Sequence, residues 1–252
     1  MKRTGGDAGL SKERAAAMMA AVQSRTTTPV SHNLNGQRLG RKGRDTRDRI
    51  LAAAAEIIEE GEEIPVSLSS VARRASLGMT SLYNYFADIT ELVLALLEPV
   101  VVTAEDAFVG MLRERWPDEE LPERCERFVR AYHDFWVRHA RLLHMRNSMA
   151  AARDSRMMLH RVAVTQPVIA LLVQQMDGDP AVPDSPATAM GSVLMTGIER
   201  AATMRTDAYL AELYDDAPRR LSAPYLRAAT RLMQITIADM RATMAAEGRL
   251  DG

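Results

Sequence analysis

A run of polar side chains between residues 79 and 86 has the chemistry needed to read the edges of DNA bases. Threonine can contact the methyl group of thymine, and asparagine can pair with adenine through two hydrogen bonds. Leu82 and Phe86 are four residues apart, so both face inward on a helix and leave polar residues near the opposite face. Tyr83 lies at the flank, where its hydroxyl can reach a phosphate. The candidate base-contacting residues are Met79, Thr80, Ser81, Asn84 and Tyr85.

Two short helices are expected to position these side chains. The pattern predicts one helix over Leu68 to Ala75 and a second over Met79 to Phe86, joined by a three-residue turn. The small residue Ala72 lets the second helix cross closely over the first. This spacing fits a helix-turn-helix, whose second helix enters the major groove. An ordinary helical hairpin in a core, with a merely solvated polar face, has the same spacing.

Basic residues are concentrated near the N-terminal end. Residues 1–44 carry nine Lys or Arg and two acidic residues, whereas the remainder carries 23 basic and 31 acidic residues. A positive arm on an acidic body favours a polyanionic partner at that end, although a solvated tail without a partner has the same composition. We interpret residues 1–44 as a mostly disordered basic arm that contacts phosphates or a minor groove. The candidate contacts are Arg41, Lys42, Arg44 and, just beyond the arm, Arg47.

The rest of the chain carries helical periodicity, and the predicted fold class is all-α. The first helix is expected from about Thr46 to Glu60, with Asp45 as its N-cap and Gly61 as its stop. A capping box over Asp88 to Glu91 opens a long helix, which Pro99 is expected to kink. Later helices are expected from Pro122 to about His139, over Arg141 to Ala152, over Ser155 to Met176, from about Pro186 to Arg205 and from about Pro224 to Ala246.

The segment from Arg47 to Leu92 resembles the DNA-binding region of the tetracycline-repressor (TetR) family of transcriptional regulators. The resemblance rests on Ile50-Leu51, Ala53-Ala54, Gly61, Val71-Ala72, Leu82-Tyr83, Phe86 and Leu92. It implies that Met79, Thr80 and Ser81 lie near bases and that Tyr83 and Tyr85 lie near phosphates. It also implies that the preceding helix offers its N-terminus to the DNA backbone, where this chain has Ser67, Ser69 and Ser70.

Three positions depart from the family pattern. The usual turn glycine is Ser76, which costs free energy where that position needs a positive φ. The usual Ser or Thr cap of the recognition helix is Gly78, a weaker cap. The usual lysine before the fourth helix is Ile89, so one charged phosphate contact is missing.

The resemblance implies a helix-turn-helix domain over residues 45–92 and a helical ligand-binding and dimerisation domain over residues 93–252. Apolar faces on the last two expected helices support a homodimer, because Gly197 and Ala201 permit close helix approach. The alternative is that these faces pack into their own core. In a dimer, two recognition helices about 34 Å apart require a near-palindromic operator. The faces comprise Met190, Val193, Leu194, Gly197, Ile198 and Ala201, and Leu226, Ala229, Met233, Ile237, Met240 and Met244.

An apolar or amphipathic small molecule is the expected effector. Aromatic residues at helical spacing and flexible methionines can line a site for such a ligand. The same stripes are also typical of a plain core. The candidate contacts are Phe128, Tyr132, Phe135 and Trp136 on one helix and Met145, Met149, Met158, Val162 and Met195 on others.

Several other classes of protein do not fit the sequence. No run of 18 uncharged apolar residues occurs, and the segment Met1 to Leu10 lacks the apolar stretch of a signal peptide, so a cytoplasmic protein without a membrane span is expected. The single cysteine, Cys125, excludes an internal disulfide or a thiolate zinc cluster. The histidines lack metal-ligand spacing and read as surface or satisfied core residues, so no metal or cofactor is expected. No motif for catalysis was found, so the chain is not expected to be an enzyme.

These patterns together predict a ligand-responsive, DNA-binding transcriptional regulator, a repressor that its effector releases from the operator. Pro99 is the expected hinge through which ligand binding alters the separation of the recognition helices. An all-α module for protein interaction or small-molecule binding, without DNA binding, is the alternative.

Overall fold

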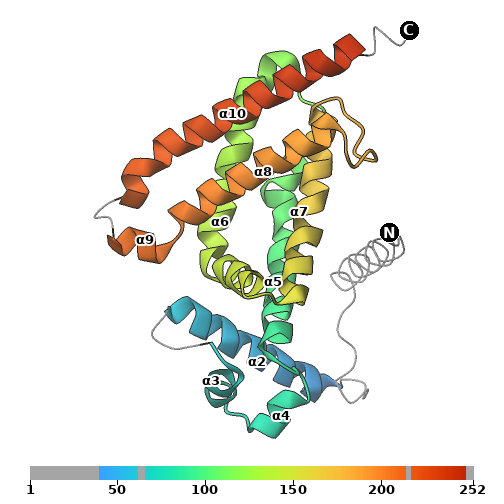
Figure 1. Cartoon of the computed structure of the whole chain (residues 1–252). Coiled ribbons are helices and arrows are strands. Elements are labelled where there is room, and N and C mark those ends of the chain that lie inside the picture. The colour runs from blue at the N-terminus through green and yellow to red at the C-terminus, as the bar shows by residue number, and fades with distance from the viewer. Residues whose placement is uncertain (1–39, 62–65, 214–216, 248–252) are drawn as a thin grey trace, which may run out of the picture. The chain divides into compact units, whose positions relative to one another are not determined.

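The computed structural model describes residues 40–61, 66–213 and 217–247 (Figure 1). Within these ranges the regular structure is helical and no strand occurs, which confirms the all-α class. The chain divides into two compact units. The first combines the described residues up to Val102 with Arg141–Ala163, and the second combines Thr103–Ala140 with the described residues from Val164 onward.

Helix α2 (Arg41–Glu60) provides one wall of the first unit. It begins one turn before the expected start, because the N–H of Arg44 already bonds the carbonyl of Gly40 at 3.1 Å. The N-cap is therefore Gly40, and the assignment of Asp45 to that place was wrong. Residues 41–44 are helical and do not belong to a disordered arm, while residues 1–39 lie outside the described residues. The expected stop at Gly61 is confirmed by its φ of 97°, which favours glycine.

Two short helices, α3 (Leu68–Arg74) and α4 (Met79–Tyr83), lie on the same side of α2 (Figure 1). Apolar side chains from all three helices share one core, which contains Ile50, Ala54, Ile57, Val71, Ala72, Leu82 and Phe86. α4 is three residues shorter than expected, since the N–H groups of Asn84 and Tyr85 bond the carbonyls of Ser81 and Leu82 three residues back. Such bonds tighten the chain into a turn and end the helix.

The first unit extends beyond the expected domain because polar contacts connect three segments of the chain. These segments are α2, the start of α5 (Ile89–Ala107) and the hairpin from α6 (Leu121–Ala151) to α7 (Ser155–Gln175). Thr90 Oγ1 donates to Asp154 Oδ2 at 2.6 Å, and Arg156 Nη2 lies 2.8 Å from Asp88 Oδ2. Arg141 Nη1 donates to the carbonyl of Ile58 at 3.0 Å.

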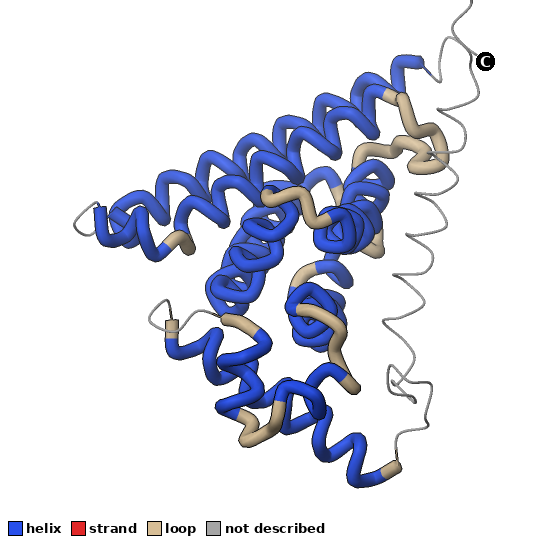
Figure 2. Tube along the Cα trace, turned by 60° about the horizontal axis from the view of Figure 1, so that its bottom comes forward, coloured by secondary structure: helices blue, strands red, loops and turns tan. Residues whose placement is uncertain are grey.

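Helices α8 (Pro186–Arg205) and α10 (Ala217–Glu247) lie side by side in the second unit, as Figures 1 and 2 agree. The unit also contains two 3-10 turns, η1 (Val109–Leu112) and η2 (Asp118–Glu120), and the short helix α9 (Ala208–Leu213). The bounds expected for α8 are confirmed, and Ser185 caps it by accepting the N–H of Thr188 at 3.1 Å. Helix α9 was not expected, and α10 starts before Pro224 instead of at it.

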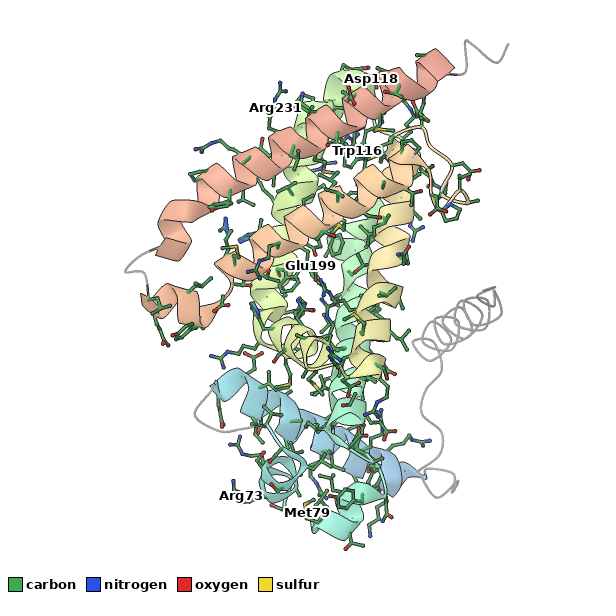
Figure 3. All side chains as sticks on the ribbon, viewed as in Figure 1. Arg73, Met79, Trp116, Asp118, Glu199 and Arg231 are labelled. Atoms are coloured by element: carbon green, nitrogen blue, oxygen red, sulfur yellow. The ribbon has the colours of Figure 1, made fainter. Side chains whose placement is uncertain are left out.

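A buried polar network connects three parts of the second unit. Gln175 Nε2 donates to the carbonyl of Leu112 at 3.0 Å, and Gln175 Oε1 accepts the N–H of Trp116 at 3.0 Å. Arg241, on α10, donates to the carbonyls of Gln175 and Trp116 at 2.7 and 2.9 Å. It also pairs with the carboxylate of Asp118, which Figure 3 shows beside α10. The network joins the end of α7, the segment between α5 and α6, and α10.

Three helices carry the chain from one unit to the other. The crossings fall at Val102/Thr103 in α5, at Ala140/Arg141 in α6 and at Ala163/Val164 in α7. Each helix has an irregular residue nearby: Pro99 in α5, His139 (φ −115°, ψ 18°) in α6 and Pro167 in α7. The break at His139 confirms that two helical segments were correctly expected there.

Helix α7 is long and apolar enough to cross a membrane by length and composition alone. Its best 18-residue window has a mean hydropathy of 1.3, and 33% of that window is buried. Core helices of soluble proteins pass the same test. The expectation of a chain without a membrane span therefore stays a prediction.

The turn between α3 and α4 provides a test of local strain. Ser76 has φ 54°, in the left-handed region that glycine adopts without cost. We expect Ser76→Gly to raise the free energy of unfolding by about 1 kcal/mol, measured by urea denaturation. The control Ala55→Gly, at an exposed position in α2, should lower it by about 1 kcal/mol. A loss of stability in Ser76→Gly would show that the turn is not strained.

Candidate nucleic-acid interface

The three serines at the start of α3 have different roles. Ser67 Oγ accepts the N–H of Ser70 at 3.1 Å, and Ser70 Oγ accepts the N–H of Ser67 at 3.0 Å, which forms a reciprocal capping box. Ser70 is buried, so its hydroxyl is used within the protein and is not presented to a phosphate. Ser69 is exposed, and its Oγ lies 3.0 Å from the Oγ of Ser67. Of the three expected contacts to the DNA backbone, Ser69 is exposed and Ser67 is partly buried.

The exposed side of α4 carries polar residues, as expected from the sequence. Thr80 and Ser81 are exposed, and the ring of Tyr83 is 49% exposed. Met79 is partly buried against the core of the unit, so its side chain also has a packing role. Asn84 and Tyr85 are partly buried and follow the helix instead of lying on it. The surface available to a partner is therefore narrower than the expected five-residue face.

The basic residues at the start of α2 belong to the same compact unit as α4. Arg41, Lys42 and Arg44 are exposed in the first turn, where no acidic residue accompanies them. Arg47 is partly buried, and its guanidinium carbon lies 5.4 Å from the centre of the Phe86 ring. This cation–π contact joins Arg47, a candidate for contact with a DNA phosphate, to the core residue Phe86.

Arg73 on α3 is a candidate contact that the sequence analysis missed. It is exposed and forms no ion pair with the residues that the structure describes. Its neighbour Arg74, in contrast, donates to Glu60 through Nη1 and Nη2 at 2.6 Å each. The Glu60 hydrogen bond raises the pKa of Arg74. Arg73 is four residues after Ser69, and this helical spacing was the available signal.

The candidate effector residues are divided between the two units. Five of them, Phe128, Tyr132, Phe135, Trp136 and Met195, are buried in the second unit. Phe108 packs edge-on against Tyr132 and Phe135, with ring centres 5.0 and 5.2 Å apart. Phe108 was not among the candidates, and its contacts give these aromatic residues a core role.

The other four candidates lie in the first unit. Met158 is 41% exposed, while Met145, Met149 and Val162 are partly buried. Nearby in the sequence, His160 is 3% exposed, and neither ring nitrogen has a hydrogen-bond partner among the described residues. Burial, and then the positive charge of Arg146, lower the pKa of His160 to about 4. His160 is thus a core histidine, but the expectation of a satisfied one was wrong.

An exposed apolar surface lies on α8 and α10 of the second unit. Val193 is 70% exposed on α8, next to the partly exposed Met190, and a side chain at Gly197 would meet open space. Leu232 and Ile235 are exposed on α10. Leu232 and Ile235 were not in the expected faces, whose members Leu194, Ile198, Met233, Ile237 and Met240 are buried in the unit's own core. The alternative that these faces pack into their own core is confirmed for the buried residues, and the dimer stays a prediction.

Metal and nucleophile chemistry find little support in the described residues. No group of three His, Cys, Asp or Glu side chains among them is placed to hold a metal ion. Cys125 is fully buried, and burial raises the pKa of its thiol to about 12. A thiol with that pKa stays protonated at neutral pH and is a poor nucleophile.

The buried His160 predicts an acid-dependent loss of stability. Its pKa is about 4 in the folded chain against 6.5 for a free histidine, so the unfolded chain binds the proton first as the pH falls. Stability is full above pH 6.5 and falls by roughly 1.4 kcal/mol per pH unit from there toward pH 4. Urea denaturation at several pH values should give a shallower pH dependence for His160→Phe. Identical profiles for both proteins would argue against a neutral buried His160.

The comparisons with known proteins leave the chain without an assigned family. No protein-family model matches it, and no curated protein matches it.

Proposed function

We propose that the protein is a ligand-responsive, DNA-binding transcriptional regulator, a repressor that a small effector releases from its operator. The observation that carries this proposal is the exposed polar surface of α4, Thr80 and Ser81 with Tyr83 at its edge, in one compact unit with exposed basic side chains. In this proposal, α3 and α4 form a helix-turn-helix, and α4 enters the major groove. Hydroxyl and methyl groups there contact base edges, and the basic residues contact phosphates.

The start of α2 supports a polyanionic partner on electrostatic grounds. The N-terminus of a helix carries a partial positive charge, which disfavours nearby cations. α2 nevertheless begins with Arg41 and Lys42 and has no acidic residue in its first turn. Bound phosphates would relieve this repulsion and would use the same N-terminal field.

Selection of bound fragments from the organism's own DNA tests the proposal most directly. The purified full chain should enrich a small set of fragments that contain a near-palindromic sequence. An electrophoretic shift at two salt concentrations should then show stronger binding to those fragments than to scrambled competitor. Equal binding to selected and scrambled DNA would favour the alternative of a helical interaction module.

Arg73 and Arg74 form a matched pair for testing phosphate contacts. Arg73→Gln should weaken binding to selected DNA and reduce the slope of log affinity against log salt by about 1, because one phosphate contact is lost. Arg74→Gln should leave that slope unchanged, since Arg74 is already paired with Glu60 and Glu56. Affinities measured by fluorescence anisotropy at three or more salt concentrations give both slopes. An equal change of slope in the two variants would remove the phosphate-contact role from Arg73.

We propose that the regulator is a homodimer formed through the exposed apolar residues of α8 and α10. Val193→Glu should weaken the dimer by about tenfold or more, because it buries an unpaired charge in the interface. The control Val137→Glu makes the same change at a 54% exposed position on α6, outside this surface. Sedimentation velocity over a concentration series measures both. A dimer that both variants weaken equally, or neither weakens, does not use this surface.

The proposed effector is an apolar or amphipathic small molecule, and the proposed location of the regulator is the cytoplasm. The polar contacts of Asp88 and Thr90 connect the start of α5, just after α4, to the α6–α7 hairpin. That hairpin carries Met145, Met149, Met158 and Val162. A ligand that displaces these side chains would thus act on residues bonded to the base of the DNA-binding helices.

A further inference from the structure

A basic groove lies between the N-terminal part of α6 and α10 in the second unit. Its volume is about 430 Å³, within the range of small-molecule sites. Pro122, Ala223 and Leu226 give it an apolar part. None of the residues proposed to contact DNA or effector lines this groove. Of the apolar faces expected to form a dimer it shares only Leu226, and the exposed Leu232 and Ile235 do not line it.

The charged residues of the groove leave a net charge of +2. Arg130, Arg227 and Arg231 line it together with one acidic residue, Glu126. Arg130 uses Nε and Nη2, at 2.9 and 2.6 Å, to bind a single carboxylate oxygen of Glu126. This ion pair neutralises one of the three guanidinium groups.

Of the three guanidinium groups that line the groove, the two on α10 are available to a ligand. Arg231 donates from Nη1 to the amide oxygen of Gln234 at 3.0 Å, a neutral partner that leaves its charge uncompensated. The side chain of Arg227 forms no hydrogen bond or ion pair with the residues described in the structure. The two residues are one helical turn apart and exposed, and Figure 3 shows Arg231 extending outward from α10.

The groove is positively charged, whereas the second unit as a whole has more acidic than basic residues. The segments that make up the second unit contain 14 basic and 20 acidic residues. A local charge of +2 in such an acidic region attracts anions to one place and not to the surface in general. Guanidinium groups bind carboxylate and phosphate oxygens through paired N–H donors, and Thr230 and Gln234 add neutral polar groups to the same lining.

We propose that this groove binds a small organic dianion, with an apolar body against Pro122, Ala223 and Leu226 and its negative charges on Arg227 and Arg231. Phosphate monoesters and dicarboxylates of aromatic or short aliphatic groups have this chemistry. The site is independent of DNA binding and of the effector proposed above.

Calorimetric titration of the full chain tests the site with phenyl phosphate and benzene-1,2-dicarboxylate as probes. We expect both dianions to bind with one site per chain, benzoate to bind more weakly and the neutral phenol not to bind. The double variant Arg227→Glu/Arg231→Glu should weaken dianion binding by about tenfold or more. The control Arg138→Glu makes the same kind of charge change at an exposed position on α6 outside the groove and should leave binding within about twofold of the parent.

Three outcomes would overturn the proposal. They are no binding of either dianion to the parent protein, equal binding to the parent and the double variant, and equal weakening in the double variant and in Arg138→Glu. Thermal melting followed by circular dichroism checks that the double variant remains folded. If it does not, the single variants Arg227→Gln and Arg231→Gln provide the same comparison with smaller charge changes.

Discussion

The burial of Leu82 and Phe86 against α2 is the constraint on which the proposed interface depends. α4 has only five residues, and a helix of that length is not stable alone in water. Its conformation therefore comes from tertiary packing, in which these two side chains are 0% and 1% exposed. Burying two side chains of this size contributes about 1.5–3 kcal/mol each. The same packing determines that Thr80 and Ser81 face outward, so the presentation of the polar surface and the stability of the unit have one cause.

The second unit depends on a different kind of interaction. Arg241 is 6% exposed, and a buried guanidinium is costly unless its donors are satisfied. Here its donors meet the carbonyls of Gln175 and Trp116 and the carboxylate of Asp118. Because these partners are far apart in the sequence, the network specifies how α7, α10 and the segment between α5 and α6 meet, which apolar packing alone does less strictly.

Local signals in the sequence predicted much of the fold. Gly61 and Pro186 mark helix ends through their own backbone preference, and both lie at those ends in the structure. The early start of α2 was missed because Asp45 is a better N-cap than Gly40 in isolation, and only the bond from the N–H of Arg44 to the carbonyl of Gly40 shows where the helix begins. The exposed face of α4 followed from the spacing of Leu82 and Phe86, whereas the burial of Ser70 depends on its capping role.

Features that depend on distant contacts could not be predicted in this way. Asp154 and Thr90 are 64 residues apart, and no local pattern indicates that they bond. Among the described residues Glu60 pairs with Arg74 and not with Arg73, and this pairing requires the packing of α3 on α2. For the same reason, Phe108 could not be recognised as the ring at the centre of the aromatic residues of α6.

The irregular residues near the three crossings affect how the chain deforms. Pro99 and Pro167 lack the N–H that would bond the carbonyl four residues back, and for Pro167 that carbonyl belongs to Ala163, at the crossing itself. His139 leaves helical geometry one residue before the crossing in α6. Bending α5 or α7 at its proline therefore breaks one hydrogen bond fewer than bending it elsewhere. These two helices are thus easiest to bend close to the residues at which the chain passes from one unit to the other.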